Sequence, residues 1–303
     1  MLDLCVIGAG PAGVSAALYA KSRGLDVTVF EQAKVGGLIG QASLVSHFAG
    51  AVVGETGPEL AARFEKQLLA AQIPIHYEKV DCLKKQDNSF SLKTIKGNYE
   101  ARQVIVATGS TPKELPLDLP ANTPVLHWAL GQKEAVRDRI VVVNGGSDGA
   151  AKEALYLAQT AREVHIVQDQ PQLLCIAEFR QQIEAAPHIT VHCGKTVSHL
   201  DTNGEEILAC TLTGADGKTE KLEAADGLHL FAMIGQAANS DLLADLLPLE
   251  NGFVRPDRSD HGVTTAIPGL YVAGDIRVKA VRQVATAVQD GCLAGIAAAA
   301  KTH

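Results

Sequence analysis

The sequence predicts an α/β protein of two Rossmann-like nucleotide-binding domains, each with three layers (β/β/α) and with the second inserted into the first. The order strand, glycine-rich turn, helix, strand occurs twice, first from Leu2 and again from Arg139. After the second copy, one more apolar strand and a long alanine-rich helix complete the chain. We therefore expect a discontinuous first domain, 1–112 with 244–303, and an inserted second domain, 113–243.

The elements of the first copy follow from the spacing of the apolar residues. An apolar strand runs into Gly-Ala-Gly-Pro-Ala-Gly, and apolar residues at helical spacing then continue until Gly24. An amphipathic pattern predicts a further helix over 57–72. The strands expected in this domain are Leu2–Ile7, Val27–Phe30, 74–80, 89–94, 103–107 and Leu270–Ala273, and the last helix begins near Ala285.

The second copy and the two crossings between domains have similar signals. Prolines recur through Pro112–Pro124, which is typical of a linker, and the return crossing is expected at Gly235–Asn239. Between them the sequence predicts a strand at Arg139–Asn144, a glycine turn at 145–149, a helix at Ala150–Ala161 and a strand at Glu163–Val167.

Composition excludes several classes of function. Hydrophobic residues make up 47% of the 303 residues and the net charge is -7, without a basic stripe, so we expect a folded protein that does not bind nucleic acid. No apolar run is long enough to span a membrane, and a strand beginning at Leu2 leaves no room for a signal peptide. The expected location is the cytoplasm. The six cysteines include no Cys-x-x-Cys, so neither a metal site nor a redox pair of that spacing is expected.

The first glycine turn has the residues that a dinucleotide requires. Gly8 permits the tight turn, Gly10 lets the backbone approach a pyrophosphate, and Gly13 allows close packing of helix on strand. The helix N-terminus then presents its positive end to the phosphates. Glu31 ends the next strand and can accept hydrogen bonds from a ribose.

Two later motifs favour FAD over NAD at this site. Ala107-Thr108-Gly109 follows a strand, and the closing strand ends in Gly274-Asp275, which can direct a carboxylate to a ribityl chain. A helix that begins just after Arg282-Gln283-Val284 can direct its positive end to a reduced flavin. The first domain is therefore expected to bind FAD.

These motifs together resemble the low-molecular-weight thioredoxin reductases and their relatives over essentially the whole chain. The resemblance rests on GAGPAG with Glu31, on ATG at 107–109 and on AGDIRVKAVRQVATAVQDG at 273–291. It implies a homodimer, and it implies FAD contacts at Gly8, Gly10, Pro11, Ala12, Gly13, Glu31, Gln32, Gly37, Leu38, His47, Val80, Gly109, Asp275, Arg282, Gln283 and Val284.

The chain departs from that family at the site of electron transfer. A thioredoxin reductase keeps a Cys-x-x-Cys just before its second glycine turn, and the same slot here holds Trp128-Ala129-Leu130-Gly131. An aromatic residue in this slot is similar to the thioredoxin-reductase-like ferredoxin or flavodoxin NADP reductases. The catalytic residues stay unknown, with Trp128, which can stack on or screen a flavin, and His47, which can hydrogen-bond to it, as the candidates.

The second glycine turn departs from the dinucleotide-binding pattern of the first. Ser147 replaces the glycine that touches the pyrophosphate, and Asp148 adds a negative charge. No basic residue follows the next strand until Arg180, whereas Asp169 can accept a ribose hydroxyl, so NADH is expected rather than NADPH. A vestigial site that binds neither is the alternative. The residues of this second site are Gly145, Gly146, Ser147, Asp148, Gly149, Glu153 and Asp169.

We expect from these features an FAD-containing oxidoreductase without a redox-active disulfide. It would pass electrons from NADH or another donor to an acceptor such as a ferredoxin, a flavodoxin or a small molecule. Two alternatives stay open. One is a disulfide reductase that uses a displaced thiol, with Cys175 as the candidate, and the other is a flavin-binding protein with little turnover.

Overall fold

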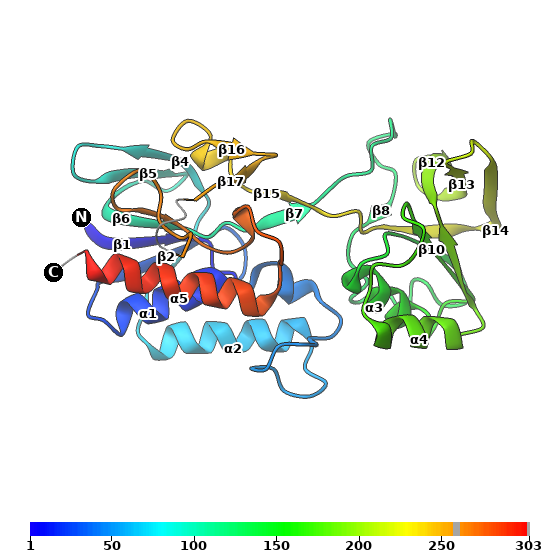
Figure 1. Ribbon diagram of the computed structural model, residues 1–303, viewed down its shortest axis with the longest axis horizontal. Helices are drawn as coiled ribbons and strands as arrows, with labels where there is room; N and C mark the ends of the chain where they lie inside the picture. Colours follow the sequence, from blue (N-terminus) through cyan, green and yellow to red (C-terminus); the bar gives the residue numbers. More distant parts are fainter. Residues whose placement is uncertain (257–260, 302–303) are drawn as a thin grey trace. The chain divides into compact units, whose positions relative to one another are not determined.

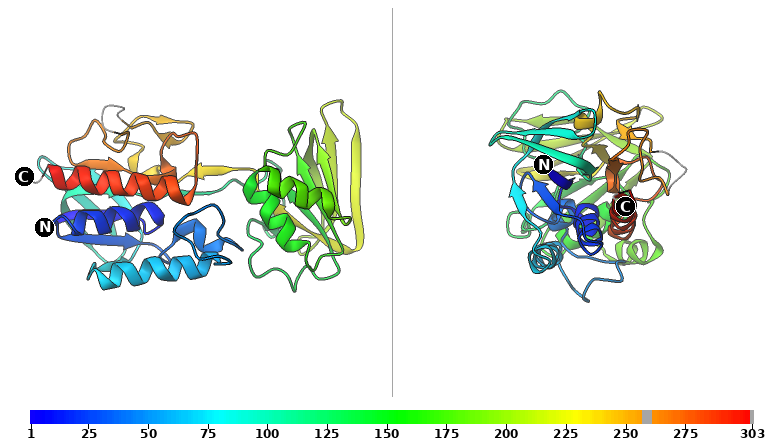
Figure 2. Two further views of the ribbon diagram at one scale, coloured as in Figure 1. Left: turned by 60° about the horizontal axis from the view of Figure 1, so that its bottom comes forward. Right: turned by 90° about the vertical axis from the view of Figure 1, so that its left-hand side faces the viewer.

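The computed structural model, which describes residues 1–256 and 261–301, confirms the predicted α/β fold with two three-layered parts. Residues 1–111 and 237–303 form one compact unit, and residues 112–236 form the other. Each unit contains its own sheet of parallel strands continued by antiparallel ones (Figures 1 and 2). Among the residues described, no helix is long and apolar enough to cross a membrane.

The first unit is built on a parallel sheet in the order β3-β2-β1-β6-β18. Three helices cover one face of this sheet, and the antiparallel pair β4 and β5 continues from β6 on the other side (Figure 1). The strands are β1 (Leu2–Ile7), β2 (Val27–Glu31), β3 (Ile75–Tyr77), β4 (Val80–Lys85), β5 (Phe90–Thr94), β6 (Asn98–Val106) and β18 (Leu270–Val272), and the helices are α1 (Pro11–Lys21), α2 (Gly57–Ala70) and α5 (Val284–Ala300).

β6 is longer than the sequence predicted, because it belongs to two layers. Its second half, near Val104–Val106, is buried on both faces and pairs in parallel with β1 and β18. Its first half alternates exposed residues with buried ones and pairs with β5 in antiparallel fashion. Alternation is typical of a half-buried antiparallel strand, and the prediction of a strand at 103–107 found only the apolar half.

The second unit repeats this design. Its parallel sheet has the order β11-β10-β9-β14-β8, two helices cover one face, and β12 and β13 continue from β14. The elements are β8 (Val125–Leu126), β9 (Ile140–Asn144), α3 (Asp148–Leu157), β10 (Glu163–Gln168), α4 (Ala177–Ala185), β11 (Ile189–Cys193), β12 (Lys195–Thr202), β13 (Ile207–Gly214) and β14 (Thr219–Ala232).

The two chain crossings pair with each other as β7 (Ser110–Pro112) and β15 (Gln236–Ala238). The return boundary lies at 236/237, whereas the sequence predicted 243/244. Asn239 donates its backbone N–H to the Gly109 carbonyl, and Leu243 is fully buried in a core of the first unit, so this segment already belongs there. Pro112–Pro124 is also more than a linker, because Leu115 packs in the core of the second unit.

The remaining short elements all belong to the first unit. They are the 3-10 turns η1 (Gly37–Gln41), η2 (Asp241–Leu243) and η3 (Gly274–Ile276), and the two-stranded sheet of β16 (Leu249–Glu250) and β17 (Phe253–Val254).

Helices α1 and α5 touch backbone to backbone through glycine. A Cβ atom added at Gly291 would lie 2.0 Å from the Ala12 carbonyl oxygen, and one added at Gly295 would lie 2.6 Å from that of Ala16. Ser15 Oγ also donates to the Val288 carbonyl at 2.7 Å across this contact. The start of α1 is therefore held firmly against α5.

We expect Gly291→Ala to lower the free energy of unfolding by about 1–3 kcal/mol, because the added methyl group must move one helix. Gly149→Ala is the matched control. Gly149 is also helical, but an added Cβ atom would meet only Ser147 Oγ at 3.8 Å. This control should be neutral or stabilising by about 0.5–1 kcal/mol. Urea denaturation of both variants checks the prediction, and equal stabilities would contradict it.

A pair of largely buried histidines joins two strands of the second unit. His165 Nδ1 lies 3.0 Å from His192 Nε2, with their outer nitrogens 3.5 Å from Glu163 and 3.3 Å from Glu220 respectively. Lys195 also binds Glu220. Burial lowers the pKa of both histidines, which outweighs the opposing effect of the carboxylates.

Since the folded protein binds protons at these histidines less readily than the unfolded chain does, its stability is full above the ordinary histidine pKa and falls as the pH decreases below it. We expect a lower urea midpoint at about pH 5.5 than at about pH 7.5, and a smaller difference when His165 and His192 are both replaced by glutamine. The exposed His199 supplies the control variant, His199→Gln. An unchanged pH dependence in the double variant would show that other groups cause it.

Candidate functional site

The glycine turn between β1 and α1 is shaped by two backbone contacts. Gly8 has a φ of +100°, and a Cβ atom there would lie 2.4 Å from the Ala107 carbonyl oxygen. A Cβ atom at Gly13 would lie 1.8 Å from the Gly8 carbonyl oxygen. Both glycines are therefore required by the packing of the turn itself.

Gly10 differs, since the protein leaves space beside it. An added Cβ atom would meet only the Gly36 carbonyl oxygen, at 4.0 Å, and its φ of -69° suits any residue. Gly10 is the N-cap of α1 and offers no side-chain cap, while Pro11 occupies the first turn. The amides of the first turn thus face an open space from which a side chain is absent, as a pyrophosphate requires.

A second glycine pair forms a wall of this space. The Gly36 N–H donates to the Ala9 carbonyl at 2.8 Å, and a Cβ atom at Gly37 would lie 3.2 Å from Gly10 Cα. Gly36 and Gly37 have φ values of +112° and +58°, which favour glycine. The predicted residue Leu38 follows in η1 and is half-buried.

Glu31 closes the turn at the end of β2. Its carboxylate is 8% exposed and accepts the backbone N–H of Ala9 at 2.8 Å and that of Ala33 at 2.9 Å. Each oxygen keeps a further lone pair for a ribose hydroxyl. Gln32, the next predicted residue, is exposed.

The chain returns to this turn after β18. A Cβ atom at Gly274 would lie 2.8 Å from Ala12 Cβ, so η3 packs directly on the first turn of α1 and brings Asp275 beside it. Gln283 is the N-cap of α5, and the helix begins at Val284 itself. Arg282 lies over the Phe253 ring at 4.1 Å and donates to the Arg277 carbonyl.

Three other predicted FAD contacts, at His47, Gly109 and Val80, fit the structure to different degrees. His47 is exposed and has a φ of +59°, a left-handed conformation that is unusual outside glycine and that occurs often at functional sites. Gly109 also has a positive φ, and a Cβ atom there would meet no other atom within 4 Å. The Val80 side chain is 4% exposed in the core between sheet layers, so it is not free to touch a ligand.

The second glycine turn has the same backbone as the first. The Gly145 N–H donates to the Val167 carbonyl at 2.8 Å, as the Gly8 N–H does to that of Phe30. A Cβ atom at Gly145 would lie 2.4 Å from the Met233 carbonyl oxygen. Ser147 is the N-cap of α3 and is exposed, so a side chain stands where Gly10 leaves the first turn open.

Gln168, a residue that the sequence analysis missed, occupies the position of Glu31 in this unit. It ends β10, is 6% exposed, and folds against Gly146, whose added Cβ atom would lie 2.8 Å from Gln168 Cδ. The separation of Gly145 from Gln168 equals that of Gly8 from Glu31, so counting residues identifies it. The predicted acceptor Asp169 is exposed one residue further on.

Beside the second turn, Leu174 takes the place that Gly36 has beside the first, so this wall carries a side chain. Leu174 donates its N–H to the Gly146 carbonyl at 2.8 Å, as Gly36 does to Ala9 in the first unit. Asp148 Oδ1 accepts the N–H of Ile176 at 2.8 Å, which ties the start of α3 to the start of α4. Glu153 is buried in α3, 3.4 Å from Lys152 Nζ.

Trp128 lies at the carboxyl edge of the second sheet. β8 pairs with β14 so that Leu126 is level with Phe231, and Phe231 is level with Val143 of β9. Trp128 is two residues beyond Leu126, as Gly145 is beyond Val143, and it is half-buried. Within this unit, the aromatic ring and the glycine turn therefore belong to the same end of the sheet.

Cys175 is a poor candidate for a redox thiol. Its side chain packs in the core of the second unit at 5% exposure, and burial raises its pKa. Arg180, the first cation after β10, donates to the Leu173 and Cys175 carbonyls at 3.2 Å. All six cysteines are free thiols.

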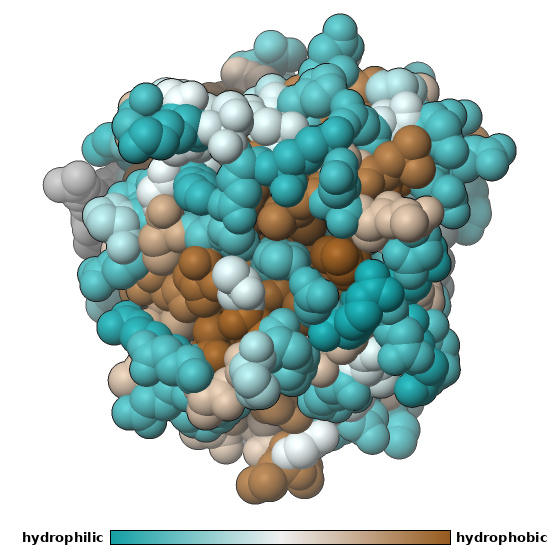
Figure 3. Space-filling model, turned by 90° about the vertical axis from the view of Figure 1, so that its right-hand side faces the viewer, coloured by the Kyte–Doolittle hydropathy of each residue, from teal (hydrophilic) through white to brown (hydrophobic). Residues whose placement is uncertain are grey.

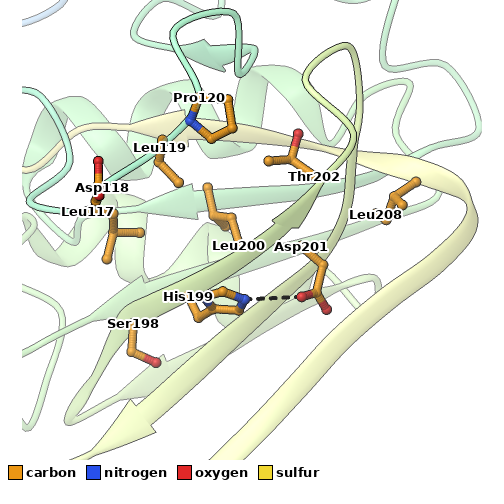
Figure 4. A pocket seen from close by; sticks show the side chains of 10 residues that line it. All are labelled: Leu117, Asp118, Leu119, Pro120, Ser198, His199, Leu200, Asp201, Thr202 and Leu208. Carbon is orange, nitrogen blue, oxygen red and sulfur yellow. Dashed lines mark hydrogen bonds and ion pairs between the residues drawn. The ribbon is translucent and has the colours of Figure 1, made fainter.

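A surface hollow of the second unit contains none of the predicted residues. It lies between the segment after β7 and strands β12 and β13, where His199 Nε2 is 3.1 Å from Asp201 Oδ1 (Figure 4). Figure 3 shows apolar side chains between hydrophilic ones on the side of this unit that it presents. The large apolar residues exposed in this unit are Leu174, Val191 and Leu208.

Comparison with known proteins identifies relatives over the whole chain. The family model Pyridine nucleotide-disulphide oxidoreductase matches residues 2–291. Thioredoxin reductase of Ureaplasma parvum is 32% identical over 300 residues, covering 97% of this chain and 94% of the relative, and that of Peptoclostridium acidaminophilum is 33% identical, covering 96% and 94%.

Solved structures share the fold. The crystal structure of T. acidophilum thioredoxin reductase superposes with a TM-score of 0.90 at 26% identity, covering 99% of this chain and 98% of that one. Bacillithiol disulfide reductase from Staphylococcus aureus, with a TM-score of 0.83 at 20% identity, covers 100% and 99%, and at this identity the likeness concerns the fold alone.

The space beside Gly10 gives a direct test of the first site. We expect Gly10→Ala to change the free energy of unfolding by about 1 kcal/mol or less, because the methyl group meets only the Gly36 carbonyl oxygen, at 4.0 Å. It should weaken binding of a dinucleotide by about tenfold or more, since the methyl group stands where the pyrophosphate must lie. Titration of the apoprotein with FAD measures this effect.

The control is Gly97→Ala, at a turn where an added Cβ atom also meets nothing. It should bind FAD as the unchanged protein does. Wild-type affinity in Gly10→Ala would mean that this turn does not hold the cofactor.

Proposed function

Because the chain belongs to the pyridine nucleotide-disulphide oxidoreductase family, we propose that it is an FAD-dependent oxidoreductase whose electron acceptor is not an internal disulfide. The observation that carries this proposal is a contrast between two features: the chain keeps a site for a dinucleotide cofactor, but it has no cysteine pair for a redox disulfide. The first glycine turn keeps the open space, the amides and the carboxylate that a dinucleotide needs. The six cysteines include no Cys-x-x-Cys, and all are free.

The residues of the first unit have defined roles in this proposal. The amides at the start of α1 bind the pyrophosphate, Glu31 accepts a ribose hydroxyl, and Asp275 accepts a hydroxyl of the ribityl chain. FAD, when bound, supplies the chemistry of accepting a hydride and releasing electrons one or two at a time. The protein therefore contributes binding, orientation and electrostatics.

NADH is the favoured donor in the second unit. Residues 168–179 contain neither Lys nor Arg, and Arg180 already donates to carbonyls of its own loop. A 2′-phosphate would thus find no cation there, whereas Asp169 is exposed and can accept a ribose hydroxyl. Gln168 replaces the carboxylate that Glu31 supplies in the first unit, so binding of NADH rests on fewer charged contacts.

The acceptor is proposed to be a small quinone-like molecule or a one-electron carrier of the ferredoxin or flavodoxin type. A hydride from NADH delivers two electrons, which reduce one quinone together with two protons, or two carriers by one electron each. Several relatives bear the name thioredoxin reductase, and reduction of thioredoxin here would require a different thiol. Burial and the raised pKa of Cys175 count against a displaced thiol.

A flavin-binding protein with little turnover is the second candidate. Ser147 at the N-cap of α3 and the Asp148 carboxylate beside it both oppose a bound pyrophosphate.

The homodimer and the cytoplasmic location stay predictions.

The function is tested by mixing the FAD-loaded protein with NADH or NADPH in the absence of oxygen. We expect NADH to bleach the flavin absorbance faster than NADPH, by about tenfold or more, because the second site lacks cations for a 2′-phosphate. The reduced protein should then pass electrons to a quinone or to a ferredoxin, and not to oxidised thioredoxin. Cys175→Ser should behave as the unchanged protein throughout.

Each result that differs from these expectations would point to a different conclusion. Faster bleaching by NADPH would overturn the donor assignment, and absence of bleaching with both would favour the protein with little turnover. Rapid reduction of thioredoxin that is lost in Cys175→Ser would establish a displaced thiol instead.

A further inference from the structure

A buried ion network lies directly behind the turn that carries Asp275. Asp290 of α5 is 8% exposed, and its carboxylate accepts the backbone N–H of Gly274 at 3.0 Å. Arg277 Nη1 lies 2.6 Å from one oxygen of Asp290, and Lys279 Nζ lies 3.0 Å from the other. A single carboxylate on α5 therefore holds the backbone of η3 and two cations that follow it.

Lys279 extends this network to the site itself. Its ammonium group is 3.2 Å from Asp275 Oδ1 and also donates to Thr286 Oγ1 at 3.2 Å. The Lys279 side chain is 12% exposed, so its charge is largely removed from solvent and depends on these partners. Two carboxylates and two cations make the cluster neutral.

The contact with Lys279 fixes which oxygen of Asp275 faces outward. Oδ1 is buried, whereas the whole Asp275 side chain is 27% exposed, so its exposure falls on side-chain atoms other than Oδ1. With Oδ1 directed to the ammonium group, Oδ2 is the oxygen left for a ligand. Without Lys279 the carboxyl group is free to rotate about χ2.

We propose that Lys279, held by Asp290, is a positioning residue that presents Asp275 Oδ2 to a hydroxyl group of the cofactor's ribityl chain. This inference rests on the proposed function, because it assigns Asp275 to FAD. Lys279 itself touches no cofactor atom in the proposal. Its effect on FAD affinity therefore passes entirely through Asp275.

A double-mutant cycle in FAD affinity tests this dependence. We expect Lys279→Gln to raise the dissociation constant for FAD by about tenfold, and Asp275→Asn to do the same or more. In the Asp275→Asn protein, adding Lys279→Gln should change the dissociation constant by about twofold or less, because the carboxylate that Lys279 orients is gone. Titration of the apoproteins with FAD gives all four values.

Two further readouts separate positioning from general stabilisation. The rise in melting temperature on FAD binding should shrink in Lys279→Gln, beyond any change in the melting temperature of the apoprotein. Lys279→Arg keeps the charge and should restore FAD affinity to within about threefold of the wild type. Lys21→Gln is the matched control, since Lys21 forms an exposed ion pair with Asp26 in the same unit.

The inference is overturned if Lys279→Gln binds FAD as the wild type does, or if the two substitutions multiply in the double variant. Either result leaves the proposed function intact, provided that the wild-type apoprotein binds FAD. Failure of the wild type to bind FAD would overturn the proposed function as well. If Lys279→Gln does not fold, Lys279→Met, which also removes the ammonium group, completes the cycle in the two Asp275 backgrounds.

Discussion

The close packing of α1 against its neighbours is the constraint on which the first site depends. Gly8, Gly13 and Gly291 each lack room for a side chain because a backbone carbonyl lies within 2.4 Å of the Cβ position. The helix start is thus fixed from the β1 side and from α5 at once. Its uncapped amides are held toward the space beside Gly10, where an anion satisfies them better than mobile water does.

The two units share the backbone contacts of the glycine turn but differ in the side chains around it. The same backbone hydrogen bonds hold both turns, at 2.8 Å from the Gly8 and Gly145 N–H groups to carbonyls of the parallel strand that follows each turn in the chain. The side chains at the two turns differ, however, because Ser147 is the N-cap of α3 where Gly10 caps α1, and the neutral Gln168 ends β10 where Glu31 ends β2. The backbone contacts are the same in both units because the packing of helix on sheet requires them. The side chains can differ, because function depends on the site and not on the fold.

The sequence predicted the parts of the fold that local patterns encode. The strand Leu2–Ile7 and the helix at the glycine turn were found because apolar periodicity and glycine signals are both local. Strands β12 and β13 were not predicted, since β12 pairs with β13 and β13 with β14, and sequence alone does not show these partners. Helix α3 begins at Asp148, two residues before the predicted start, because Ser147 is the N-cap.

The candidate site was predicted in the same uneven way. Gly8, Gly10, Gly13 and Glu31 have a fixed spacing, so the sequence was sufficient to propose them. Lys279 and Asp290 escaped because their role depends on α5 packing beside η3, a contact between a loop and the side of a helix that follows it. Charged residues in such a segment are normally solvated, and only their burial reveals a network.

By its resemblance to the thioredoxin reductases, the chain has Trp128 where those proteins keep a thiol pair, and this limits the reactions that we propose for it. An indole ring at the carboxyl edge of the second sheet can stack on or shield a planar ligand, but it cannot exchange a disulfide. In the proposed function, electrons that reach the first unit therefore leave directly from FAD to an external acceptor. Such transfer demands access and orientation rather than a reactive side chain, which agrees with a site made of glycines, backbone amides and a braced carboxylate.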